Sequence, residues 1–225
     1  MEQNLDKNKT NIGFWEQILN APTPAYKELF DEEKKYLSEN IKEDSFVLDI
    51  GCGEGRNMAF IFEKTPHVYG IDNDPQAVKE AQEHFKDQKD VQVFYAEAEK
   101  LPFENETFDT VTFLMILPNL ENNKEASMIE SARVLKKDGE LILSTFAETA
   151  FDERMKVYKA FNLPIVAVEG TKVIFDKSVG AHTSEQFSLE QLSELGKKAG
   201  LIIKKHQKVG DIAYLCTFQK VADGQ

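Results

Sequence analysis

The residues best placed to do chemistry lie in one short stretch, where an acid is followed by a run of glycines. Asp49 lies near the end of an apolar, β-prone segment at 46–50, and glycines then occupy alternate positions from Gly51 to Gly55. Apolar residues return at helical spacing afterwards, so the order predicts a strand, a tight turn and a helix. Glycines remove every Cβ from such a turn, so a ligand above the strand end can touch the main chain.

The side chains beside the glycines indicate the kind of ligand. A dinucleotide fingerprint requires a third glycine at the position where this chain has Arg56. A carboxylate at Asp49 would repel a pyrophosphate and attract a cation. The stretch therefore favours a cationic ligand, and it argues against a nicotinamide-dependent oxidoreductase.

A second acid ends the next predicted strand, 67–72. Asp72 lies about 20 residues beyond the glycine turn, which is where nucleotide-binding folds of this kind hold the two hydroxyls of a ribose. The two oxygens of one carboxylate can accept from both hydroxyls at once. Asp74 fits better as the N-cap of the helix that Pro75 begins.

The remaining elements must bring these residues to one edge of a sheet. Apolar runs predict further strands at 91–96, 108–117, 140–146, 201–203 and 212–218, and helical spacing or capping predicts helices within 12–40 and at 75–86, 122–135 and 188–200. This alternation is typical of a doubly wound α/β fold with helices on both faces of the sheet. Leu114 and Met115 end the most continuous run, so they fit either the floor of a ligand pocket or a plain core position.

At residues 46–57 the chain resembles the first motif of the class I S-adenosylmethionine-dependent methyltransferases, whose cofactor carries an ammonium group and a sulfonium and no phosphate. The resemblance continues at Asp72, in the turn Glu97-Ala98 to Phe103, and at Phe108-Asp109, and it is looser in the C-terminal helix and hairpin. The family usually has Asp at the position of Glu97. Many relatives also place a histidine near Pro118, so a mechanism that needs that histidine is excluded.

This resemblance implies a fold and a cofactor. The fold is a mostly parallel seven-stranded sheet whose last strand is antiparallel. The cofactor is S-adenosylmethionine, with S-adenosylhomocysteine as the product and no metal ion. The cofactor-binding residues implied are Asp49, Gly51, Cys52, Gly53, Asp72, Asn73, Glu97, Ala98 and Leu114.

We expect two functional regions around this core, an N-terminal helical lid at 1–45 and the cofactor-binding methyltransferase domain at 46–225. Within the domain, residues 147–186 form a loosely patterned insertion after the fifth predicted strand, at the rim that faces the ligand, and they predict a substrate cap. Trp15 and Tyr26 are the lid aromatics best suited to face a sulfonium, although packing against the sheet is the simpler interpretation of each.

The motifs assign no catalytic residue. His182, Tyr158 and Glu185 lie near the predicted cap and are candidates for a general base or a substrate ligand. A solvated loop histidine is the simpler interpretation of His182. A base is required only if the acceptor is protonated at neutral pH, because the sulfonium is already a good leaving group.

The composition and net charge of the chain limit the kinds of molecule that it is expected to bind. The chain has 225 residues, two cysteines and a formal net charge of -12, and its isoelectric point is near 4.9. Clustered basic residues for nucleic acid are not expected at this charge, and no apolar run is long enough to cross a membrane. We expect a cytoplasmic protein, monomeric or homodimeric, that methylates a small molecule. A non-catalytic module that binds the same cofactor remains an alternative, as does an RNA or protein methyltransferase.

Overall fold

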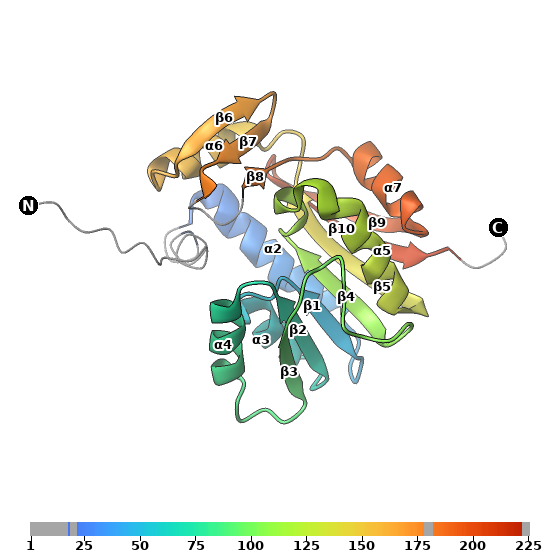
Figure 1. The fold of residues 1–225 in the computed structure, drawn as a ribbon. Coiled ribbons are helices and arrows are strands. Elements are labelled where there is room, and N and C mark those ends of the chain that lie inside the picture. Colours follow the sequence, from blue (N-terminus) through green and yellow to red (C-terminus); the bar gives the residue numbers. More distant parts are fainter. Residues whose placement is uncertain (1–17, 19–21, 178–181, 222–225) are drawn as a thin grey trace, which may run out of the picture.

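The structure is a computed structural model that describes residues 18, 22–177 and 182–221. Its centre is a seven-stranded sheet in the order β3-β2-β1-β4-β5-β10-β9 (Figure 1). The strands are β1 (Val47–Ile50), β2 (Val68–Asp72), β3 (Val91–Tyr95), β4 (Phe108–Leu114), β5 (Leu135–Phe146), β9 (Leu201–Val209) and β10 (Ala213–Lys220). Strands β1 to β5 are mutually parallel, and β10 is antiparallel to both neighbours. The expected sheet, with an antiparallel last strand, is confirmed.

Helices cover both faces of this sheet. The helices are α2 (Pro24–Asn40), α3 (Arg56–Phe62), α4 (Pro75–His84), α5 (Lys124–Val134), α6 (Phe151–Ala160) and α7 (Leu189–Lys198), with short 3-10 turns at Leu117–Asn119 and Glu121–Asn123. One apolar core joins α2, α3 and α4 to the sheet. A second core joins α5 and α7 to the opposite face. The fold is therefore doubly wound, as predicted.

Two strands are longer than the sequence predicted. Strand β5 begins at Leu135 rather than at 140, because Leu135 pairs with Phe108 and the Lys136 ammonium binds the carboxylate of Asp109 at 2.8 Å. Strand β9 runs to Val209 rather than ending at 203. Its second half is polar because β9 is an edge strand with a solvent-exposed side, where lysines also discourage pairing with other chains.

The predicted helical preface is seen in part. Thr23 caps α2 and Pro24 begins it, while the expected first helix and Trp15 lie outside the described residues. The buried residues of α2 follow the helical repeat, from Tyr26 and Leu29 to Glu33 and then Tyr36. Helix α2 therefore packs one continuous face against the sheet.

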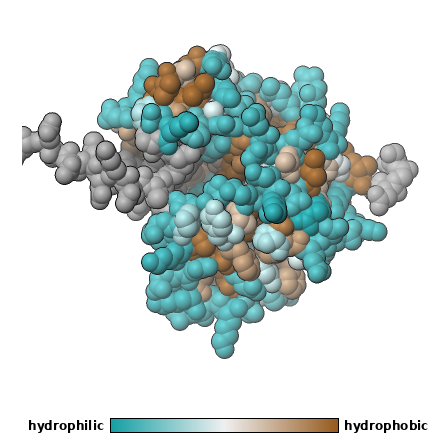
Figure 2. Space-filling view, viewed as in Figure 1, coloured by the Kyte–Doolittle hydropathy of each residue, from teal (hydrophilic) through white to brown (hydrophobic). Residues whose placement is uncertain are grey.

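The insertion after β5 forms a small layer of its own. Helix α6 is followed by a three-stranded sheet of β6 (Ile165–Glu169), β7 (Lys172–Phe175) and β8 (Thr183–Ser184). We call α6 and this sheet together the cap. The cap lies at one end of the molecule (Figure 1). An apolar patch marks this end in Figure 2, where Val166 and Val168 of β6 are exposed. Within the part of the chain that is described, no helix is both long and apolar enough to span a bilayer.

Candidate active site

The glycine turn connects β1 to α3, and its three glycines have different surroundings. All three have positive φ. A Cβ added at Gly51 would lie 2.3 Å from Ile116 Cδ1, and one at Gly55 would lie 2.5 Å from the Phe85 ring. Within the described part of the chain, a Cβ at Gly53 would meet nothing within 4 Å. Gly51 and Gly55 therefore leave room for the side chains of Ile116 and Phe85, whereas Gly53 faces open space among the described residues.

Asp49 is buried in the middle of the sheet beside this turn. Its Oδ1 accepts a hydrogen bond from Thr112 Oγ1 at 2.6 Å. Its Oδ2 is buried and has no hydrogen-bond partner among the described residues. Burial, opposed by the Thr112 bond and the Arg56 charge, raises the pKa of Asp49 to about 7. Burying a carboxylate oxygen without a partner costs free energy, and a ligand group that is cationic or donates a hydrogen bond would recover it.

Asp72 ends β2 and is tied to the glycine turn. Its Oδ2 accepts from the backbone N–H of Gly53 at 2.9 Å, and its Oδ1 accepts from the N–H of Asp74 at 2.9 Å. Burial raises the pKa of Asp72 against these bonds. Each oxygen keeps a further lone pair for a ligand hydroxyl. Asp74 accepts from Gln76 N–H and caps α4, as predicted.

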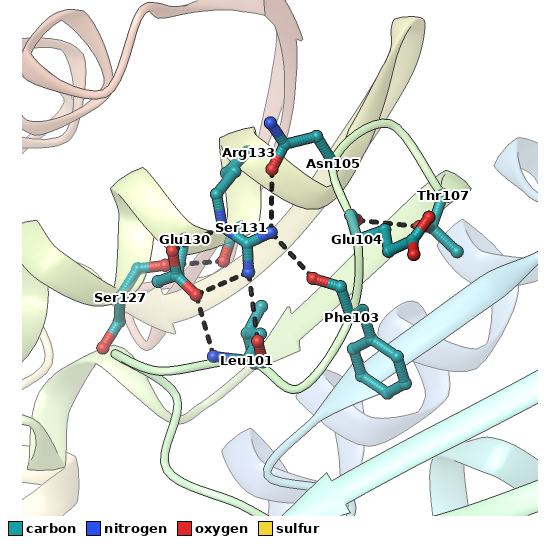
Figure 3. A network of polar contacts seen from close by, with 9 residues as sticks. All are labelled: Leu101, Phe103, Glu104, Asn105, Thr107, Ser127, Glu130, Ser131 and Arg133. Atoms are coloured by element: carbon teal, nitrogen blue, oxygen red, sulfur yellow. Dashed lines mark hydrogen bonds and ion pairs between the residues drawn. The ribbon is translucent and has the colours of Figure 1, made fainter.

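The ends of β2 and β3 meet through two more of the predicted residues. Asn73 Nδ2 donates to Glu97 Oε2 at 3.0 Å, and both side chains are exposed. Ala98 is buried in the turn that follows. Contacts from α5 hold the continuation of this turn: Glu130 accepts from the N–H of Leu101, and Arg133 donates to the carbonyl oxygens of Leu101 and Phe103 (Figure 3). The loop that carries Glu97 is thus held in place by helix α5.

The ends of β4 and β5 complete the edge of the sheet. Leu114 and Met115 are almost fully buried, and Leu114 pairs with Ser144. Met115 has φ +56 and its N–H donates to Ser144 Oγ at 3.0 Å. Cys52 is also buried, and desolvation raises the pKa of its thiol, so it is an unreactive packing residue in this state.

Glu33 and Arg56 were not predicted as site residues. Glu33 comes from α2 and is fully buried; its Oε1 accepts from Ser144 Oγ, and its Oε2 lies 3.4 Å from Arg56 Nη2. Arg56 also lies over the Phe30 ring. The sequence carried one signal for Glu33, a charged residue within the apolar stripe of a predicted amphipathic helix.

The cap candidates have different surroundings. The Tyr158 hydroxyl bonds Ser184 Oγ at 2.7 Å, within a network centred on Arg154. Glu185 forms ion pairs with Lys124 and Lys172. His182 is half-buried and its carbonyl oxygen accepts from Phe175 N–H. Tyr158 and Glu185 therefore already have partners within the cap and its contacts.

Tyr26, the described member of the predicted aromatic lid pair, is fully buried. Its ring packs edge-on against Phe30 and Phe146, with centroids 6.1 Å apart in each case. Its hydroxyl has no hydrogen-bond partner within the part of the chain that the structure describes. Among the described residues, no three His, Cys, Asp or Glu side chains are grouped as a metal site would require.

Fold and site together define a class of protein. A sheet in this order, with a glycine turn after β1 and acids at the ends of β1 and β2, is the Rossmann-like methyltransferase architecture. A protein from Pyrococcus horikoshii OT3 has the same fold, with a TM-score of 0.69, 22% identity and coverage of 96% of this chain and 97% of that chain. A Burkholderia thailandensis 1,6-didemethyltoxoflavin-N1-methyltransferase, solved with S-adenosylhomocysteine, has a TM-score of 0.65 at 17% identity, covering 84% of this chain and 76% of that one.

Sequence comparison agrees with the fold. Residues 48–143 match the family model described as a methyltransferase domain. A ubiquinone/menaquinone biosynthesis C-methyltransferase from Vibrio vulnificus is 27% identical over 164 residues, which cover 68% of this chain and 63% of that protein. The chain thus spans a little under two thirds of this relative's length. The chain therefore carries a match to a methyltransferase domain at residues 48–143, within a fold that it shares with solved S-adenosylmethionine-dependent methyltransferases.

Proposed function

We propose that this protein transfers a methyl group from S-adenosylmethionine to a small-molecule acceptor. The observation that carries the proposal is the buried, unpartnered Oδ2 of Asp49, beside a glycine turn in which Gly53 faces open space. An amino acid ammonium group would satisfy that oxygen. These residues therefore fit the cofactor that the family implies.

The predicted site residues have complementary roles in this proposal. Asp72 would hold the ribose hydroxyls while remaining bonded to Gly53 N–H. Glu97, Asn73 and the N–H of Ala98 would border the adenine, and Leu114 would form the apolar floor. Gly51 and Cys52 would contribute main chain. The nine residues come from the ends of four neighbouring strands, which is where doubly wound sheets bind ligands.

Catalysis in this proposal depends on positioning. When bound, the sulfonium supplies a methyl group on a good leaving group. The protein's part is to hold an acceptor in line and exclude water, and orientation alone can contribute about 7 to 11 kcal/mol. The cap and α2 are the elements that would enclose the acceptor, because they meet beside the end of β5. There, Tyr26 of α2 and the guanidinium of Arg154 in α6 both pack against the ring of Phe146.

A small molecule is the acceptor that the charge favours. A net charge of -12 disfavours RNA as a substrate. The Vibrio relative is named for a quinone-biosynthesis reaction, and it too acts on a small molecule by that name. We further propose a cytoplasmic protein.

Binding and turnover should be tested in that order. Calorimetry should show S-adenosylmethionine binding, and the melting temperature should rise with S-adenosylmethionine and not with NAD. Formation of S-adenosylhomocysteine should then depend on an acceptor from a panel of small metabolites, with total RNA and unfolded protein as competing arms. Failure to bind the cofactor would refute the proposal. Binding without turnover on any arm would instead favour the non-catalytic module.

A further inference from the structure

Glu33 is an acid in a place where an apolar residue would be expected. It occupies the buried stripe of α2 and is 1% exposed. Burying a carboxylate costs free energy that an aliphatic side chain would not lose, so a structural role alone is a poor explanation for it. Burial accordingly raises the pKa of Glu33. The cost points to a use for the negative charge.

The contacts of Glu33 place it at the edge of the sheet where the site lies. Its Oε1 is 2.5 Å from Ser144 Oγ, the same hydroxyl that accepts from the N–H of Met115 just beyond β4. Its Oε2 pairs with Arg56, the first residue of the helix that follows the glycine turn. Helix α2 thus delivers a carboxylate to the junction of β4, β5 and the glycine turn.

Among the residues that the structure describes, the charged side chains at this junction are more negative than positive. Three carboxylates, those of Glu33, Asp49 and Asp72, act with one guanidinium, that of Arg56. Arg56 lowers the pKa of both Glu33 and Asp49, while Asp72 and Glu33 raise the pKa of Asp49. The unpartnered Oδ2 of Asp49 lies in the same group. When the three acids are ionised, the junction carries excess negative charge and favours a ligand of positive charge.

We infer that Glu33 makes this site prefer the cationic sulfonium cofactor over its neutral thioether product. This inference rests on the proposed function. S-adenosylmethionine and S-adenosylhomocysteine share the ammonium group, the carboxylate and the nucleoside, so they differ at the sulfur by one methyl group and one positive charge. A carboxylate that attracts this charge strengthens binding of the substrate relative to the product, so it favours replacement of bound product by substrate. Glu33 is then a specificity-determining residue supplied by α2.

The test is the ratio of two dissociation constants measured by calorimetry at pH 8. For the wild type, the Kd of S-adenosylhomocysteine divided by that of S-adenosylmethionine gives the preference for positive charge. Glu33→Gln keeps the shape and a partner for Ser144, and we expect it to lower this ratio about three- to ten-fold, the effect of one partly screened charge. Glu39→Gln removes the same charge from an exposed site on the same helix and should leave the ratio unchanged.

A second variant tests whether the ratio of the two dissociation constants changes in the expected direction. Arg56→Gln removes the cation that offsets Glu33, so the ratio should rise, opposite to the change in Glu33→Gln. It also provides the measurement if Glu33→Gln does not fold. Equal ratios in the wild type and in every folded variant would overturn the inference while leaving cofactor binding intact. A wild type that binds neither ligand would overturn the inference and the proposed function together.

Discussion

Asp72 accepts a hydrogen bond from the backbone N–H of Gly53 at 2.9 Å, so the end of β2 fixes the turn that follows β1. The same carboxylate is the one proposed to hold the ribose. Its charge therefore acts both on the shape of the glycine turn and on the ligand, and substitutions there must separate the two effects.

We predict that Asp72→Asn weakens S-adenosylmethionine binding by more than about ten-fold, because a neutral amide is a weaker acceptor for hydroxyl groups. Asp74→Asn is the matched control. It removes the same charge two residues away, and asparagine caps a helix as well as aspartate does. Calorimetry on both variants, with circular dichroism to check folding, separates them. Equal affinities would remove Asp72 from the ribose site.

The pKa of Asp49 predicts opposite effects of pH on stability and on binding. Because its pKa rises from 3.8 to about 7 on folding, the folded protein without ligand binds an extra proton between these values. The stability that this proton contributes is complete below about pH 4 and is lost as the pH rises through about 7.

A cationic ligand prefers the ionised form of Asp49, so S-adenosylmethionine affinity should rise with pH until about 7, by up to about ten-fold per unit. Asp49→Asn should bind the cofactor weakly at every pH and should melt with less pH dependence than the wild type between pH 5 and 8. Melting curves and calorimetry over this range provide the measurement. A variant with the wild-type pH profile would contradict the role of Asp49.

Two glycine substitutions should fail for different reasons. Gly51→Ala places a methyl group against the Ile116 side chain at positive φ, so it should destabilise the fold by about 1 to 3 kcal/mol. Gly53→Ala meets only open space, so it should fold with a strain of about 1 kcal/mol yet bind the cofactor poorly. Urea denaturation measures the stability of both variants, and calorimetry measures their affinity for the cofactor. Normal binding by Gly53→Ala would show that no ligand approaches this part of the turn.

Arg154 should be essential to the cap. It is fully buried and donates to Tyr158 Oη, to the carbonyl oxygens of Thr171 and Ser184, and to the side chains of Ser184 and Gln186. Arg154→Lys cannot reproduce this planar set of donors, so we expect it to destabilise the cap by about 2 to 4 kcal/mol. Lys156→Gln, on the exposed face of α6, should have no such effect.

Hydrogen exchange of the cap amides measures the difference between these two variants. Faster exchange confined to α6 and strands β6 to β8 in Arg154→Lys is the expected result. Unchanged protection would mean that the network does not hold the cap.

Much of the fold was predictable because its signals are local. The apolar runs, Pro75 after Asp74, and the Ser188 and Gln191 capping box each fix an element through neighbouring residues, and the structure confirms them. The extra length of β5 was not predictable, because it depends on Phe108 and Asp109, which are distant in sequence.

The sequence by itself determined the class of the fold and the turn, because glycine spacing and strand-end acids act through short-range backbone geometry. It also indicated Asp49 and Asp72 as acids of the proposed cofactor site. Only the tertiary structure decided that Gly53 is open while Gly51 and Gly55 are filled, and that Glu33 meets Ser144 and Arg56. These relationships join segments far apart in the chain, and they depend on side-chain packing and burial, which no local pattern encodes.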